Sequence, residues 1–204
     1  MAARPRLLVT GFGAFPGAPE NPTESLVNDS RMAKVARLKG VDLVAEVLPV
    51  EYALLDVWTQ ALDALRPHAI LHFGLAASAG TIRVETKAHN NAAPYRADAG
   101  GMLPARRLHP HGRAVLRANV PVDGLMQAIR ATGLFVRRSH DAGDYLCNAI
   151  LYSSLAWCAT RPGAMAGFIH VPRQSAEDLR PAFEASIGAL LTRLASPRTA
   201  PSPG

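Results

Sequence analysis

Short apolar strand patterns alternate with amphipathic helix patterns through the first 74 residues, and this restricts the chain to the α/β class of folds. The alternation predicts strands over residues 6–10, 41–50 and 69–74, and helices over residues 23–39 and 51–65. The last of these strands, AILHFG, is a continuous apolar run, as expected when both faces of a sheet are covered. Because strands and helices follow one another at this spacing, we expect a parallel α/β sheet.

The rest of the chain adds further elements and one long loop. Apolar patterns predict strands over residues 81–90, 134–139 and 166–171, and helices over residues 123–132, from about residue 146 onward, and from a cap at Ser175 to about residue 194. Gly and Pro are frequent over residues 91–112, and a loop of that length is usually functional or mobile. With 204 residues the chain suits one domain, which we place at residues 1–195, followed by a disordered tail at 196–204.

The charge and the apolar runs exclude two classes of partner. The formal net charge is +6, but the arginines are scattered and no basic stripe with interleaved aromatic residues occurs, so we expect no nucleic-acid binding. No apolar run reaches the roughly 18 residues that a membrane span requires, so we expect no membrane insertion. The densest basic group is interpreted as a solvated face; it consists of Arg106, Arg107, Arg113 and Arg117.

Two cysteines, Cys147 and Cys158, indicate a reducing compartment. They are eleven residues apart, about 16 Å along one continuous helix, which is too far for a disulfide bond. The N-terminus enters a strand pattern directly, without the apolar core of a secretory signal. We therefore expect a cytoplasmic protein.

Cys147 is the strongest candidate for a reactive group. The segment HDAGDYLCNAILYSSLAW, residues 140–157, opens with turn-forming residues and continues with helical apolar spacing. Cys147 falls in the first turn of that helix, where unpaired N–H groups and the positive end of the helix dipole favour the reactive thiolate. A lone cysteine in a helix is, however, often only a small buried hydrophobe.

Two other side chains can complete a catalytic group with Cys147. His170 ends an apolar strand just before Pro172, and sites in open α/β sheets gather at the carboxyl ends of strands. Cys147 follows the strand over residues 134–139, so we expect it at the same edge, with His170 as its base. Glu85 lies within a strand pattern and could orient the imidazole as the third member of a triad.

Two weaker motifs could suggest nucleotide binding or metal binding, but neither is complete. Gly11-Phe12-Gly13 follows a strand, but Pro16 stands where the third glycine of a dinucleotide-binding loop would fall. The two histidines of His109-Pro110-His111 have no clear third ligand, so we predict no metal site.

Four blocks taken together resemble the pyroglutamyl peptidase I (pyrrolidone-carboxylate peptidase) family of cysteine peptidases, over about residues 6–195. The blocks are LVTGFGAFPGAPENP at residues 8–22, IRVETKAHN at 82–90, SHDAGDYLCN at 139–148 and GFIHVP at 167–172. Their order puts Glu before Cys before His, whereas papain-like enzymes carry the cysteine near the N-terminus.

The resemblance implies a fold, an activity and a set of roles. The fold would be a three-layer α/β/α sandwich around a mixed, mostly parallel sheet, usually assembled as a homo-oligomer, a tetramer or a dimer. The activity would be removal of N-terminal pyroglutamate from peptides through a thioester, without a metal or other cofactor. The roles implied are nucleophile for Cys147, base and acid for His170, orienter for Glu85, pyrrolidone pocket for Phe12 and Phe15, and oxyanion hole for Arg96, the last with a one-residue offset.

The chain also departs from the family pattern. Gly74 is followed by Leu75, where many bacterial members have a glutamine that binds the pyrrolidone carbonyl. Two alternatives therefore stay open. One is an amidase that uses the same triad on another small N-acyl group, and the other is a non-catalytic binder of capped N-termini.

Overall fold

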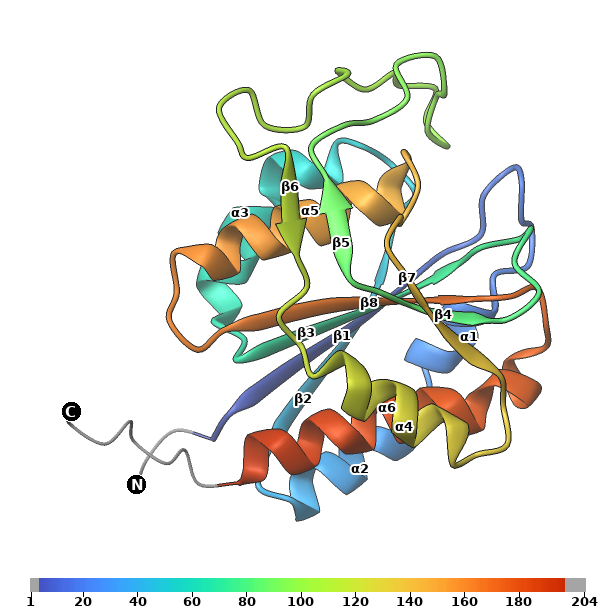
Figure 1. The fold of residues 1–204 in the computed structure, drawn as a ribbon, viewed down its shortest axis with the longest axis vertical. Coiled ribbons are helices and arrows are strands. Elements are labelled where there is room, and N and C mark those ends of the chain that lie inside the picture. The colour runs from blue at the N-terminus through green and yellow to red at the C-terminus, as the bar shows by residue number, and fades with distance from the viewer. Residues whose placement is uncertain (1–3, 197–204) are drawn as a thin grey trace.

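A twisted sheet of six strands forms the centre of the molecule (Figure 1), in a computed structural model that describes residues 4–196. The strand order is β2-β1-β3-β8-β4-β7. The strands are β1 (Arg6–Phe12), β2 (Asp42–Leu48), β3 (Ala69–Leu75), β4 (Ile82–Glu85), β7 (Val136–Ser139) and β8 (Met165–Val171). The first four in the sheet are parallel, whereas β4 pairs with β8 antiparallel and β7 follows the direction of β4.

Helices cover both faces of the sheet. One layer contains α3 (Leu54–Leu65) and α5 (Leu146–Ala159), and the other contains α1 (Pro22–Val27), α2 (Arg31–Leu38), α4 (Val122–Arg130) and α6 (Ala176–Ala195). Each layer buries its own apolar cluster against the sheet, with Phe168 among the residues facing α5 and Ile169 among those facing α6. The predicted three-layer α/β/α sandwich around a mixed, mostly parallel sheet is confirmed.

The predicted single strand over residues 81–90 is wrong. The chain forms β4 and then leaves the sheet, and β5 (Lys87–His89) pairs with β6 (Val115–Arg117) in a second, two-stranded sheet beside α5. Thr86 makes the transition, because both its N–H and its hydroxyl donate to the carbonyl of Ser139 on β7. The strand β6 was not predicted from the sequence.

The predicted single helix over residues 23–39 is also wrong, since the chain forms α1 and α2 with a break between them. Asn28 ends α1, and the Asp29 carboxylate accepts a 3.0 Å hydrogen bond from the N–H of Arg31, the first residue of α2. Short polar side chains that bond the nearby backbone compete with a continuous helix. The hydrophobic spacing alone did not show this break.

The other predicted elements are confirmed to within a few residues. Ser175 caps α6 by accepting a hydrogen bond from the N–H of Asp178.

Cys147 and Cys158 are both free. The predicted tail begins at Ser196, and residues 197–204 lie outside the described part of the chain. Among residues 4–196 there is no helix whose length and apolar character would allow it to cross a membrane.

Candidate active site

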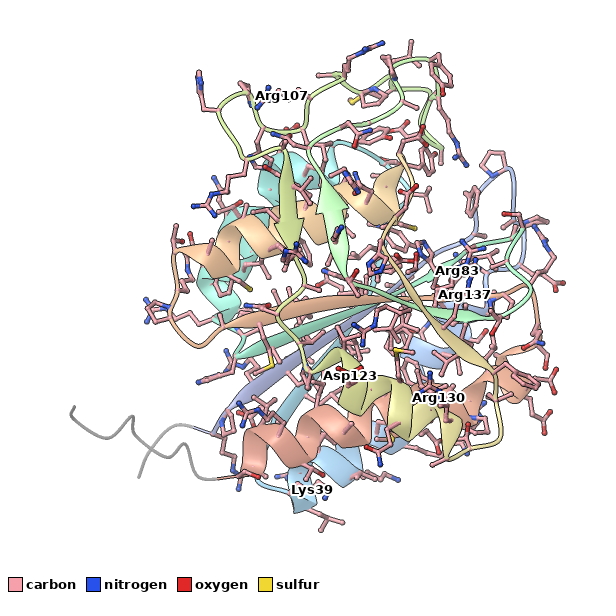
Figure 2. The ribbon with its side chains drawn as sticks, in the orientation of Figure 1. Lys39, Arg83, Arg107, Asp123, Arg130 and Arg137 are labelled. Atoms are coloured by element: carbon pink, nitrogen blue, oxygen red, sulfur yellow. The ribbon has the colours of Figure 1, made fainter. Side chains whose placement is uncertain are left out.

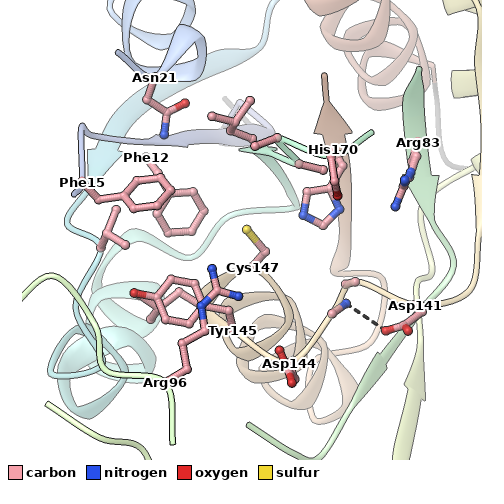
Figure 3. Close-up of a pocket in the computed structure, with 18 residues that line it drawn as sticks. Phe12, Phe15, Asn21, Arg83, Arg96, Asp141, Asp144, Tyr145, Cys147 and His170 are labelled. Carbon is pink, nitrogen blue, oxygen red and sulfur yellow. Dashed lines mark hydrogen bonds between the residues drawn. The ribbon is translucent and has the colours of Figure 1, made fainter. Parts of the chain in front are cut away.

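A pocket of about 430 Å³ contains five of the six side chains that the sequence singled out. Phe12, Phe15, Arg96, Cys147 and His170 all line it (Figure 3). They come from β1 and its following loop, the long loop after β5, the start of α5 and the end of β8. The sixth, Glu85, is fully buried and bonded to His170.

The register between β4 and β8 brings Glu85 to the imidazole. Glu85 is the Cα partner of Phe168, two residues before His170, so both side chains project from the face that α5 covers. The Nδ1–H of His170 donates a 2.8 Å hydrogen bond to Oε1 of Glu85. Because the carboxylate can only accept, this bond fixes the tautomer and leaves Nε2 for the thiol side.

The electrostatics of His170 depend on its two acidic neighbours. Burial disfavours the charged imidazole, but the charge of Cys147 and its hydrogen bond with the ring, together with Glu85, outweigh burial. They raise the pKa of His170 to about 9. At neutral pH the imidazole is therefore protonated when the sulfur is a thiolate.

Cys147 reaches the sheet because Gly74 has no side chain. A Cβ at position 74 would lie 2.9 Å from Sγ of Cys147 and 2.6 Å from Cζ of Phe168, both too close for carbon. Gly74 is also the Cα partner of His170 on β8. The glycine therefore opens the space in which the sulfur and the imidazole share one face of the sheet.

The strand-direction argument that placed Cys147 at this edge is wrong, although the cysteine does lie in the pocket. The strand before it, β7, runs antiparallel to β8, so the carboxyl ends of the two strands point in opposite directions. The loop over residues 140–145 connects β7 to the start of α5. Residues 141–145 of this loop line the pocket, and so does Cys147, which follows them in the sequence.

The first turn of α5 presents unpaired donors to the pocket. Tyr145 occupies the N-cap position but makes no side-chain capping bond, and Leu146 and Cys147 line the cavity. Uncapped N–H groups at a helix N-terminus bind negative charge. Asn148 in the same turn is buried and joins α5 to β5, because its side chain accepts from the N–H of His89 and donates to the carbonyls of His89 and Asn91.

Phe12 and Phe15 form the apolar side of the pocket, on the far side of Cys147 from His170 in Figure 3. Their loop is held in place by hydrogen bonds. The N–H of Phe12 donates to the Thr23 hydroxyl at 3.0 Å, and the Asn21 side chain donates to the carbonyl of Gly13 at 3.1 Å. A fixed pair of aromatic rings suits a small, flat, uncharged group.

Arg96 reaches the pocket from the long loop over residues 91–112. Its guanidinium lies 4.0 Å from the centroid of the Tyr145 ring, a cation–π contact. Backbone contacts hold the loop to the body, since the N–H of Ala93 donates to the carbonyl of Asp144 and the buried Asp98 carboxylate accepts from the N–H of Tyr52. These contacts fix this part of the loop against the body of the protein, where it forms one side of the pocket.

Sequence reasoning missed three residues of the site. Gly74 was noted only as the end of a strand, and neither Tyr145 nor Arg83 was named as a site residue. Tyr145 and Arg83 nevertheless line the pocket, and Gly74 lies against Cys147. For Arg83 a signal was present. Side chains two apart on a strand share a face, so the face of Glu85 is also that of Arg83.

The candidate metal pair His109 and His111 has no metal-binding surroundings. Within residues 4–196 no three or more His, Cys, Asp or Glu side chains are grouped so as to hold a metal ion. Nε2 of His109 instead lies 3.4 Å from the hydroxyl of Ser153.

Comparison with known proteins gives the same family as the sequence blocks. The family model described as pyroglutamyl peptidase matches residues 5–180. A pyrrolidone-carboxylate peptidase from Pyrococcus furiosus is 31% identical over 170 residues, which cover 82% of this chain and 80% of the relative. Another from Levilactobacillus brevis is 33% identical over 174 residues, covering 82% and 81%.

Solved structures agree with the sequence relatives. A mutant pyrrolidone carboxyl peptidase from Pyrococcus furiosus superimposes with a TM-score of 0.84 at 28% identity, covering 93% of this chain and 99% of that one. Because the family model spans most of the chain and several relatives exceed 30% identity, the chain belongs to the pyroglutamyl peptidase family.

Proposed function

We propose that this protein is a cysteine peptidase that removes N-terminal pyroglutamate from peptides, with Cys147 as nucleophile, His170 as acid and base, and Glu85 as the orienting carboxylate. The observation that carries the proposal is the buried 2.8 Å bond between Glu85 and His170, whose imidazole shares the pocket with the thiol of Cys147. Nucleophile, base and orienter then stand in the order that triads require.

The first half of the reaction forms a thioester. The pyrrolidone ring packs against Phe12 and Phe15, and the thiolate of Cys147 attacks the carbonyl carbon that joins pyroglutamate to the next residue. The protonated imidazole of His170 gives its proton to the leaving nitrogen as the C–N bond breaks. The pKa of about 9 supports this role, because the proton is present at neutral pH.

The second half releases the acyl group. His170, now neutral, takes a proton from water, the resulting hydroxide attacks the thioester carbon, and the C–S bond breaks to return the thiolate and free pyroglutamic acid. The carboxylate of Glu85 stabilises the imidazolium each time it forms.

The oxyanion of both tetrahedral intermediates would rest on one donor at the start of α5 and one on the long loop after β5. The N–H of Cys147 is one, and the Arg96 guanidinium is the other that we propose, since both residues line the pocket. Removing one such donor typically costs about 10²–10³-fold in rate.

The test is hydrolysis of pyroglutamyl, prolyl and alanyl fluorogenic amides by the purified protein, side by side. We expect the pyroglutamyl amide to be cleaved with a kcat/KM at least about 100-fold above the other two, because a free amine on proline or alanine is poorly solvated between two phenyl rings. Equal cleavage of all three, or cleavage of none, would contradict the proposal.

Leu75 favours one alternative substrate. It lines the pocket where many relatives would offer an amide, so the lactam carbonyl loses a side-chain donor. An amidase for another small N-acyl group would use the same triad, and a panel of N-acyl amides separates the two activities. A non-catalytic binder of capped N-termini would retain pyroglutamyl peptides intact.

The remaining expectations belong to the same proposal. Residues 1–195 would act as one peptidase domain in the cytoplasm, which the two free cysteines support, and without nucleic acid as a partner. The chain would form a homo-oligomer, a dimer or a tetramer, as the family resemblance implies. Light scattering during size-exclusion chromatography measures the assembly, and a salt-dependent gel shift tests for nucleic acid.

A further inference from the structure

Arg83 on β4 projects into the pocket beside the catalytic histidine. It is the Cα partner of His170, and residues paired in this way lie about 5 Å apart and point to the same face. Val84, between Arg83 and Glu85, packs in the opposite core with Ile169. The geometry therefore directs the Arg83 guanidinium toward the site, where it lines the cavity (Figure 3).

The charge of Arg83 is not balanced by contact with another group. Within residues 4–196 its guanidinium forms no ion pair and no hydrogen bond, and its Nε is buried without a partner. Glu85, two residues along, accepts from His170 through Oε1, and its Oε2 is also buried without a hydrogen-bond partner and forms no ion pair with Arg83. A buried N–H without an acceptor is costly, and a ligand that accepts a hydrogen bond from it would remove that cost.

The other charged groups around Arg83 do not satisfy it. Asp141 and Asp144 line the same pocket, but neither forms an ion pair with it, and Asp141 accepts a 2.8 Å bond from the N–H of Gly143. Arg137, the Cα partner of Arg83 on β7, adds a second positive charge (Figure 2). The pair makes this side of the site attractive to an anion.

The position of Arg83 defines which part of the substrate it meets. In Figure 3 the phenyl rings of Phe12 and Phe15 lie on one side of Cys147, and Arg83 lies beyond His170 on the other. His170 must reach the leaving nitrogen, so the chain that departs extends past the imidazole toward Arg83. The arginine therefore faces the leaving group and not the pyrrolidone ring.

We propose that Arg83 binds a carboxylate on the residue that follows pyroglutamate, and so sets the preference of the enzyme for its leaving group. This inference rests on the proposed peptidase function. The planar guanidinium matches a carboxylate with two parallel hydrogen bonds. Two sources offer that group close to the leaving nitrogen: the free α-carboxylate of a pyroglutamyl dipeptide, and the side chain of Asp or Glu after pyroglutamate.

Matched substrate pairs test the proposal and separate the two sources. Pyroglutamyl-alanine is compared with its C-terminal amide, and pyroglutamyl-glutamate amide with pyroglutamyl-glutamine amide. In at least one of the two pairs we expect kcat/KM for the acidic peptide to exceed that of its neutral partner by about tenfold, the scale of one charge-assisted contact partly screened by water. The pair that shows the difference identifies the source of the carboxylate.

The variants Arg83→Gln and Arg83→Lys supply the decisive readout, which is the ratio of kcat/KM within a pair. Arg83→Gln should bring the ratio close to one. Arg83→Lys should keep part of the preference for the acid, because lysine retains the positive charge but cannot donate two parallel hydrogen bonds to a carboxylate. Arg130→Gln on α4 is the matched control, since it removes the same charge from an exposed position outside the pocket.

Each other outcome has a definite meaning. Ratios near one for both pairs in the wild type, or a ratio that Arg83→Gln leaves unchanged, overturn the inference while the peptidase function stands. If Arg83→Gln lowers both members of a pair equally and moves the pH profile, Arg83 only balances Glu85 and the inference is wrong. If the wild type cleaves none of the four peptides, the proposed function fails and this inference fails with it.

Discussion

Glu85 and His170 lie on strands that run in opposite directions, and their side chains meet at 2.8 Å because both project from the sheet face that α5 covers. The carboxylate is fully buried, so this contact is shielded from salt and solvent. The pair holds the imidazole in one orientation toward the thiol before any substrate arrives.

Replacing Cys147 by Ser or Ala should abolish release of pyroglutamate from a fluorogenic amide, lowering kcat by a factor on the order of 10³ or more. The reason is that neither side chain offers a thiolate to the substrate carbonyl. Cys158→Ala is the matched control and should keep wild-type turnover, since Cys158 lies at the other end of α5. An active Cys147→Ala enzyme would contradict the assignment.

Glu85→Gln should move the alkaline limb of the pH profile of kcat/KM. In the wild type the pKa of His170 is raised to about 9, so activity should decline above that pH as the proton needed by the leaving amine is lost. Without the carboxylate the pKa of His170 falls, and we expect the limb to shift down by about one unit. A profile of unchanged shape and lower amplitude would mean that Glu85 acts only through folding.

Gly74→Ala should lower kcat/KM strongly while destabilising the fold only moderately. The added methyl group would displace Sγ of Cys147 or the ring of Phe168, and a displacement of about 1 Å in a site can cost about 100-fold in rate. Overpacking should destabilise the fold by about 1–3 kcal/mol. Gly80→Ala is the control, because a Cβ there has no neighbour within 4 Å. Urea unfolding and kcat/KM measured on both variants decide the point.

His72 should make the fold sensitive to acid. It is fully buried in a hydrogen-bonded chain with Thr10 at 2.7 Å and Ser154 at 2.9 Å, and burial lowers the pKa of His72 to about 3. The unfolded chain takes up this proton near pH 6.5, so stability should fall as the pH drops from 6.5 toward 3. The slope is about 1.4 kcal/mol per pH unit for one such group.

Urea unfolding of His72→Gln between pH 4 and 6 measures this contribution. The variant should be less stable near neutral pH but should lose stability less steeply with acid than the wild type. His111→Gln, in an exposed loop, should keep the wild-type slope. Equal slopes in all three proteins would show that His72 does not titrate between the folded and unfolded states.

The elements that the sequence predicted well are those whose signal is local. The apolar run of β3 and the helical spacing after Cys147 both identify their elements directly. The reversal of β4 and β7 carries no such signal, because the four residues from Ile82 to Glu85 do not encode which neighbour they pair with. That reversal is set by the whole sheet, and so the edge at which Cys147 lies could not be reasoned from strand order.

The candidate site was predictable in part, through motif and residue type. Cys147, His170 and Glu85 could be named because their chemistry is distinctive, and the resemblance supplied Phe12 and Phe15. Arg83 was missed, since an arginine in an alternating strand is ordinarily exposed. Its place on the same strand face as Glu85 could have been inferred from the spacing, but its pairing with His170 is known only from the register between β4 and β8.

The two sulfur atoms of α5 differ so much in surroundings that the molecule contains its own internal standard. Cys158 is buried, and burial raises the pKa of its thiol to about 12, whereas Cys147 opens into the pocket. A thiol-selective alkylating reagent at neutral pH should therefore consume one equivalent per folded chain and two per denatured chain. Labelling stoichiometry then counts competent molecules in any preparation, independently of which peptide the enzyme meets in the cell.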